Sequence, residues 1–186
     1  VFNADGNTQL TATKKVLGQA IPFVGEYGIS KNPESFASES YRVYFADKVR
    51  GSIIRLSKDG LTPISSHGMK RWFRDNLKLS NKIVGSYDDK KEEYNITLDN
   101  SVGGNPKTVS FKEDVKGWVS FKSFYPENAI SCANEYFTFS QGKIWKHHSN
   151  PYRNVFYNVR TSSSVDVILN DFPKSIKSFH SLNYDG

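Results

Sequence analysis

The pair His147-His148 is the first group with possible chemistry, because imidazole is a common ligand of zinc. Neighbouring residues on a β-strand point to opposite faces, so the two side chains cannot easily bind one ion. The sequence around them offers no further cluster of histidine, cysteine or carboxylate residues that would complete a ligand set. We therefore expect no metal site, and we expect both histidines at the surface or in an interface.

Four carboxylates gather in Asp88-Asp89 and Glu92-Glu93. Paired acids can hydrolyse glycosides when one protonates the leaving oxygen and the other acts as nucleophile or base. Here the acids flank Lys90 and Lys91 in a stretch with the composition of a turn. This context favours a solvated hairpin tip over a catalytic pair.

The stretch Ser57–Thr62 (SKDGLT) distantly resembles the Asp-box turn of sialidase propellers. It lacks both the residue between Asp59 and Gly60 and the closing tryptophan of that motif. A sialidase would also need an arginine cluster around a nucleophilic tyrosine, which we cannot assemble from the sequence. There is no nucleophile elbow, Walker loop or dinucleotide fingerprint. We therefore expect no enzyme activity, no catalytic residue and no cofactor.

Aromatic and basic residues are interleaved from Trp145 to Arg153 (WKHHSNPYR). Such a stretch can stack on bases or sugars and hold phosphate. It can equally contact protein, because Tyr, Trp and Arg are enriched at interface hot spots. We favour protein contact and do not expect a nucleic-acid partner. The residues expected to contact a partner or ligand are Trp118, Trp145, His147, His148, Tyr152 and Arg153.

Composition indicates a globular β-protein of 186 residues, with 37% hydrophobic and 14% aromatic residues. The formal charge of +6 permits contact with nucleic acid, phosphorylated glycans or acidic proteins, and does not choose among them. No apolar run reaches the length of a membrane span. The lone Cys132 excludes an intramolecular disulfide, and we expect a partly or fully buried thiol.

Around these residues the chain is organised by hairpins, of which Phe45–Ser65 is the clearest. It reads as three short strands joined by two tight turns, one of them carrying the Asp59-Gly60 signal of a hairpin. Similar units follow at 87–98, 111–121 and 137–145. Asp47, Ile54 and Leu56 recur 42 residues later as Asp89, Ile96 and Leu98.

A period of roughly 40 to 50 residues is the blade length of β-propellers, although such a match also arises between ordinary hairpins. The predicted fold class is all-β, built from antiparallel hairpins and meanders, either propeller-blade-like or a sandwich. We expect Phe45, Ile54 and Leu56 in the core. One short amphipathic helix is predicted at about 67–78, capped by Ser65 or Ser66. Its apolar stripe is Met69, Trp72, Phe73 and Leu77.

Residues 1–26 are expected to form an arm or loop, and residues 27–186 an antiparallel β region with its last strands at 165–169 and 176–182. The sequence begins on Val1 without a methionine and ends on Asp185-Gly186. We therefore expect a segment of a longer polypeptide.

Several motifs together resemble large virion structural proteins of tailed bacteriophages, nearest to contractile-tailed phages of cyanobacteria and more distantly to tail proteins of crAss-like phages. They are YGISKNPESFA (27–37), YFADKVRGSIIRLSKDGLTPIS (44–65), GSYDDKKEEYNITL (85–98), GWVSFKSFYPE (117–127), FTFSQGKIWKHH (137–148) and SIKSFHSLNYDG (175–186). The family has no catalytic signature, so the resemblance implies no functional residue.

The resemblance implies a tail-associated virion protein, made in the host cytoplasm, whose partners are other virion proteins and copies of itself. Two alternatives stay open. A module that binds a host receptor or glycan would need exposed aromatic residues in a groove, with Trp118, Trp145 and Tyr152 first to examine. A polysaccharide-cleaving propeller enzyme would depend on acids such as Asp59 or Asp89.

Overall fold

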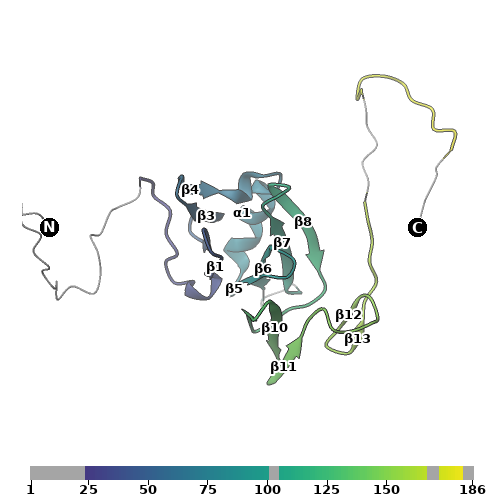
Figure 1. Ribbon diagram of the computed structural model, residues 1–186. Helices are drawn as coiled ribbons and strands as arrows, with labels where there is room; N and C mark the ends of the chain where they lie inside the picture. The colour runs from purple at the N-terminus through teal and green to yellow at the C-terminus, as the bar shows by residue number, and fades with distance from the viewer. Residues whose placement is uncertain (1–23, 101–104, 167–171, 182–186) are drawn as a thin grey trace, which may run out of the picture.

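The computed structural model describes residues 24–100, 105–166 and 172–181. Its strands form antiparallel sheets, which confirms the predicted all-β class (Figure 1). The first sheet has the order β1-β2-β3-β4, with β1 Ala37–Ser38, β2 Val43–Asp47, β3 Ser52–Ser57 and β4 Gly60–Pro63. The second has the order β5-β6-β7-β8, with β5 Lys82–Asp88, β6 Glu93–Asp99, β7 Lys107–Lys112 and β8 Gly117–Lys122.

Two smaller sheets follow the second four-stranded sheet. One has the order β11-β10-β9, with β9 Asn128–Cys132, β10 Glu135–Ser140 and β11 Lys143–Lys146. The other is the hairpin of β12 Val155–Phe156 and β13 Val159–Arg160. The described residues after Arg160 contain no strand, so the strands expected at 165–169 and 176–182 are absent where the structure describes them; their remaining residues lie outside it.

The meander predicted at Phe45–Ser65 is confirmed as β2, β3 and β4. Both turns use glycine with positive φ, Gly51 at 65° and Gly60 at 93°. A Cβ on Gly51 would lie 2.8 Å from Arg74 Cα, so this turn presses against the helix. The hairpins expected at 87–98, 111–121 and 137–145 are also present as β5-β6, β7-β8 and β10-β11.

The helix α1 spans Lys70–Leu79, close to the predicted range, but it has no serine cap. Ser65 and Ser66 belong instead to the short 3-10 helix η2, Ile64–Ser66. The predicted apolar stripe is confirmed: Phe73 and Leu77 are buried, and Met69 and Trp72 pack against the core. The ring centroids of Phe73 and Trp118 in β8 lie 4.4 Å apart, and this contact joins the helix to the second sheet.

The main core lies where both four-stranded sheets and α1 meet. Tyr44 from β2 stacks on Tyr94 from β6, with ring centroids 4.7 Å apart. Each meander has the strand order of a propeller blade, whereas the shared core is the arrangement of a sandwich. The core cluster contains Ala37, Tyr44, Ala46, Ile53, Ile64, Phe73, Leu77, Ile83, Tyr94, Ile96, Leu98, Val109 and Phe111.

The expectation of a core position is confirmed for Ile54, which is fully buried, and was wrong for Phe45 and Leu56. In the β2-β3 register, Tyr44 pairs with Arg55 and Phe45 pairs with Ile54. Phe45 and Ile54 therefore lie on the face of the sheet opposite to Tyr44. Ile54 is buried there, while Phe45 and Leu56 are half-buried.

Residues just before β1 also contact this first sheet. The Gly28 N–H donates to Asp47 Oδ2 over 3.1 Å, and Glu26 forms a 3.3 Å ion pair with Arg50. Most of the expected arm, residues 1–23, lies outside the described residues. The division at residue 26 therefore stays a prediction.

The 3-10 helix η1, Pro33–Ser35, connects the two main sheets through Ser35. The Ser35 hydroxyl accepts the Ala46 N–H of β2 over 3.0 Å, and the Ser35 carbonyl accepts the Tyr94 hydroxyl of β6 over 3.0 Å. A Cβ on Gly85 in β5 would lie 2.0 Å from that carbonyl oxygen. Glycine at this position therefore lets η1 contact the sheet directly.

Candidate interaction surface

The second sheet buries a polar face opposite its apolar one. Thr97 and Thr108 hydroxyls lie 2.8 Å apart, and Ser110 donates to Asn95. Alternating polar residues in a strand normally indicate a solvent face, so sequence reasoning missed this layer. The structure buries it because the region from Phe124 through the β9-β11 sheet packs over this side. The buried polar residues of the face are Ser86, Asp88, Asn95, Thr97, Thr108 and Ser110.

Tyr136 from β10 is the main contact between this face and the covering sheet. Its side chain is buried, and its hydroxyl lies 2.7 Å from Ser86 Oγ. Burial raises the pKa of Tyr136 above its ordinary value. At an edge of the seam, Ser131 in β9 donates to the Tyr87 carbonyl over 2.7 Å. The covering sheet is thus held by hydrogen bonds as well as by packing.

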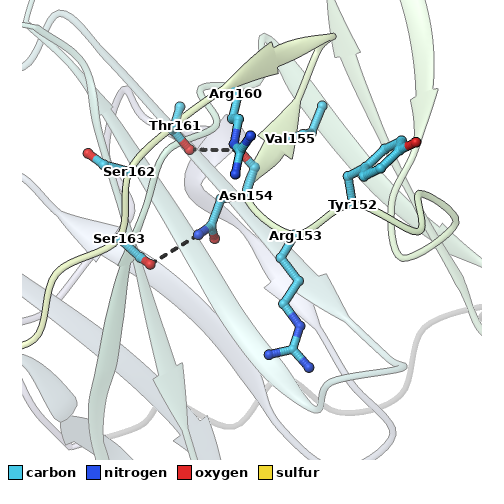
Figure 2. A pocket seen from close by; sticks show the side chains of 8 residues that line it. All are labelled: Tyr152, Arg153, Asn154, Val155, Arg160, Thr161, Ser162 and Ser163. Carbon is cyan, nitrogen blue, oxygen red and sulfur yellow. Dashed lines mark hydrogen bonds between the residues drawn. The ribbon is translucent and has the colours of Figure 1, made fainter. Parts of the chain in front are cut away.

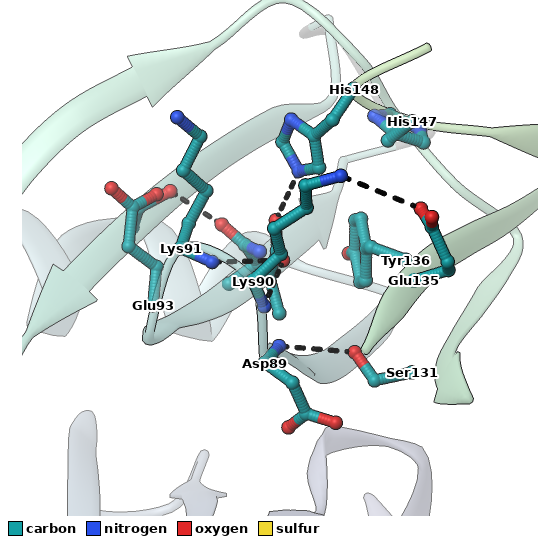
Figure 3. Close-up of polar contacts among 12 residues, drawn as sticks. Asp89, Lys90, Lys91, Glu93, Ser131, Glu135, Tyr136, His147 and His148 are labelled. Atoms are coloured by element: carbon teal, nitrogen blue, oxygen red, sulfur yellow. Dashed lines mark hydrogen bonds and ion pairs between the residues drawn. The ribbon is translucent and has the colours of Figure 1, made fainter. Parts of the chain in front are cut away.

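Asp88 is buried, so the expectation that it lies in a solvated hairpin tip was wrong. Its carboxylate accepts the N–H groups of Lys90 and Lys91 and, over 2.7 Å, Nε2 of His148 (Figure 3). A carboxylate is only an acceptor here, so His148 donates its Nε2 proton. The turn residues 89–92 themselves are exposed, as expected.

A second ion-paired group borders this site in Figure 3. Glu135 in β10 lies 3.2 Å from Lys146 in β11 and 3.7 Å from Lys90. The hydrogen bond from Lys146 lowers the pKa of Glu135. These partly exposed ion pairs contribute little stability.

His147 is buried within the chain, whereas a position at the surface or in an interface was expected. Its Nε2 lies 2.8 Å from the hydroxyl of Thr138, which also accepts the Tyr157 hydroxyl over 3.1 Å. Burial, followed by the nearby His148, lowers the pKa of His147 from 6.5 to about 4. The His147 ring is therefore neutral near pH 7, and its Nε2 is hydrogen-bonded within the molecule.

The two tryptophans among the predicted contact residues occupy different environments. Trp118 packs against the main core and donates Nε1–H to the Ile64 carbonyl over 3.2 Å. Trp145 is half-buried and contacts Tyr157 edge-on at 5.4 Å. Trp118 is also half-buried and lines a concave region with Asn154, Ser162 and Ser163, whereas Trp145 lines another with His147 and His148.

Tyr152, Arg153 and His148 are the predicted contact residues that the structure leaves exposed, and His148 is bound to Asp88. Tyr152 and Arg153 line an open pocket with a volume of about 810 Å³, which Figure 2 shows. Asn154 shapes it, because its carbonyl accepts both the N–H and the hydroxyl of Thr161, and its amide donates to Ser163. We call this the C-terminal surface; its residues are Tyr152, Arg153, Asn154, Val155, Arg160, Thr161, Ser162 and Ser163.

Sequence reasoning missed Arg160 as a member of this surface. Residues 136–165 contain no Asp or Glu, and this signal could have identified the whole segment as a basic one. Among the described residues, neither Arg153 nor Arg160 forms an ion pair, and both are exposed. Two free guanidinium groups beside hydroxyl and amide groups suit carboxylates on a partner.

The polar groups around the histidines form hydrogen bonds within the fold. Within the described part of the chain, His147 binds buried Thr138 and His148 binds Asp88, so neither activates an exposed hydroxyl or thiol. The described residues hold no group of three or more potential metal ligands. Cys132 is exposed in β9, so the expectation of a partly or fully buried thiol was wrong.

No helix in the described ranges has the length and apolar character needed to cross a bilayer. No curated protein matches this chain. The family model described as Crassvirus muzzle protein matches residues 9–142, which is most of the chain and covers both four-stranded sheets. The match confirms the resemblance to crAss-like phage proteins, while the resemblance to cyanobacterial phages stays a prediction. The chain therefore belongs to the crassvirus muzzle protein family, a family of phage virion structural proteins.

Proposed function

We propose that this chain is a non-enzymatic, tail-associated component of the virion that works through contacts with other virion proteins and with copies of itself. The carrying observation is the family match over residues 9–142. A fold in which both main sheets share one hydrophobic core suits a scaffold. The hydrogen-bonded roles of His147, His148 and Asp88 agree with the same reading.

The C-terminal surface is the part we assign to partner contact. Tyr152 has 75% of its surface exposed, and the two arginines beside it are unpaired. Tyrosine and arginine supply much of the binding energy at protein interfaces. The partner that fits is an acidic surface of a neighbouring virion protein, including another copy of this chain. This surface lies outside the matched residues 9–142, so it is proposed for this chain alone.

Fractionation of purified virions into heads and tails tests the location. The proposal expects peptides of this chain in the tail fraction. Their confinement to the head fraction would contradict tail association.

Charge reversal tests the contact. Arg153→Glu with Arg160→Glu should abolish incorporation into assembled particles, because two unpaired cations become anions facing an acidic partner. The matched control is Lys70→Glu with Lys78→Glu, the same charge change on the exposed face of α1. The control should incorporate normally. Normal incorporation of the Arg153/Arg160 double variant would reject the assigned surface, and binding of isolated chain to host glycans through Tyr152 would favour a receptor-binding role instead.

A further inference from the structure

The hairpin β12-β13 is held in place by a small number of side chains. A two-stranded hairpin of this size is not stable alone in water. Its inner residue Phe156 lies 5.3 Å from Phe124 and 6.0 Å from His147, measured between ring centroids. Tyr157, in its turn, contacts Trp145 and bonds to Thr138. Figure 1 shows that the hairpin lies beside β10 and β11 and that the described chain continues from it.

The protons along this contact can be assigned from the hydrogen bonds. Thr138 is completely buried, and its hydroxyl has only Tyr157 and His147 as partners among the described residues. The Tyr157 hydroxyl donates to Thr138. The single Thr138 proton then finds an acceptor only at His147 Nε2, because otherwise it would be buried without a partner. His147 is therefore the tautomer with its proton on Nδ1.

A second proton on His147 has no place in this arrangement. The hydroxyl of Thr138 would have to turn away, and its own proton would lose its acceptor. The titratable groups around the ring are His148, Tyr136 from β10, Tyr157 from the hairpin and Asp88 from β5. Asp88 is the one anion among them, and it is bound to His148. The low pKa of His147, about 4, agrees with this geometry.

We propose that neutral His147 is the positioning residue of hairpin β12-β13, and that a proton added at its Nε2 releases the hairpin together with the C-terminal surface. The chain order supports the second part, because Tyr152–Ser163 contains both the hairpin and the residues that shape the surface. The inference concerns the isolated chain and does not depend on the proposed function.

Hydrogen exchange of the full chain tests the proposal at pH 7 and pH 4. The probe is the Thr161 amide, which donates to the Asn154 carbonyl over 2.8 Å when the hairpin is closed. After correction for intrinsic exchange, its protection should fall by up to about two orders of magnitude at pH 4. Amides of β6, in the main core, serve as the internal reference for global unfolding. Unchanged Thr161 protection in wild type would overturn the proposal.

Variants separate His147 from other acid-sensitive groups. His147→Gln should remove the pH dependence of Thr161 protection, whereas His148→Gln should keep it. Equal pH dependence in wild type and His147→Gln would overturn the proposal. A measurement without substitution adds a second test: the ring nitrogen shifts of wild type should show the Nδ1–H tautomer at pH 7, and the Nε2–H tautomer would overturn the assignment.

Discussion

Gly85→Ala tests the contact between η1 and the second sheet, which depends on the absence of one side chain. The new methyl group would lie 2.0 Å from the Ser35 carbonyl oxygen and 2.6 Å from its carbon. Both are backbone atoms, so η1 must move away by more than about 1 Å to restore an ordinary contact distance. Movement on that scale also breaks the 3.0 Å bonds that join Ser35 to Tyr94 and Ala46.

The expected loss of stability follows from these two effects. Overpacking of a tight site costs about 1–3 kcal/mol. Leaving buried hydrogen-bonding groups without partners costs about 1–3 kcal/mol more. The free energy of unfolding should therefore fall by about 2–6 kcal/mol, a large part of the total for a domain of this size.

Urea unfolding followed by tryptophan fluorescence measures this change. With a slope of about 2 kcal/mol per molar urea, the midpoint should fall by about 1–3 M. Gly28→Ala is the matched control, because a Cβ there meets no atom within 4 Å. Its midpoint should stay close to wild type. Equal midpoints for Gly85→Ala and Gly28→Ala would refute the reasoning about η1.

Three further predictions concern packing, ionisation and charge. Phe73→Ala should lower the free energy of unfolding by about 3–5 kcal/mol, because Phe73 is fully buried where α1 meets Trp118; a loss below about 1 kcal/mol in urea would contradict that packing. The unfolded chain binds a proton at His147 between its ordinary pKa of 6.5 and the folded value of about 4, so stability should be full above pH 6.5 and fall on acidification through this window, by at most about 3 kcal/mol. Thermal unfolding of His147→Gln should lack this component, and an identical pH profile would count against it. Arg71→Ala should change stability by less than about 0.5 kcal/mol, since the side chain is 87% exposed in its pair with Asp75, and a larger loss would show an unrecognised contact.

Local patterns predicted the hairpins because their determinants are local. Asp-Gly turns and runs of β-forming residues are read within a few positions, and the meander at Phe45–Ser65 follows from them. The helix stripe is equally local, since Phe73 and Leu77 are one turn apart. The absence of a serine cap arose from η2, which uses Ser65 and Ser66 in a preceding turn.

The faces of the sheets could not be predicted, because they depend on contacts between distant residues. Phe45 and Ile54 are as apolar as Tyr44 and Ile53, and only the register decides which pair faces α1 and the second sheet. The polar face of β5-β8 looks solvent-exposed in sequence. Its burial under Tyr136 involves residues about 50 positions apart, such as Ser86 and Tyr136.

The prediction of contact residues was also limited by contacts between residues that are distant in the sequence. Interleaved aromatic and basic residues predicted Trp145–Arg153 as a contact segment, and the structure divides this segment into two parts. His147 faces inward, where it bonds to Thr138, while Tyr152 and Arg153 face outward on the C-terminal surface. A strand pattern cannot show this division, because His148 adopts positive φ and turns the chain between the two parts.

Hydroxyl-radical footprinting of intact virions tests the central claim most directly, namely that the C-terminal surface contacts another virion protein. Tyr152 is 75% exposed in the chain, so it should react readily in isolated protein and be strongly protected in the virion. Tyr136, which is buried in the chain itself, provides the reference for full protection. Equal labelling of Tyr152 in isolated protein and in virions would contradict the account.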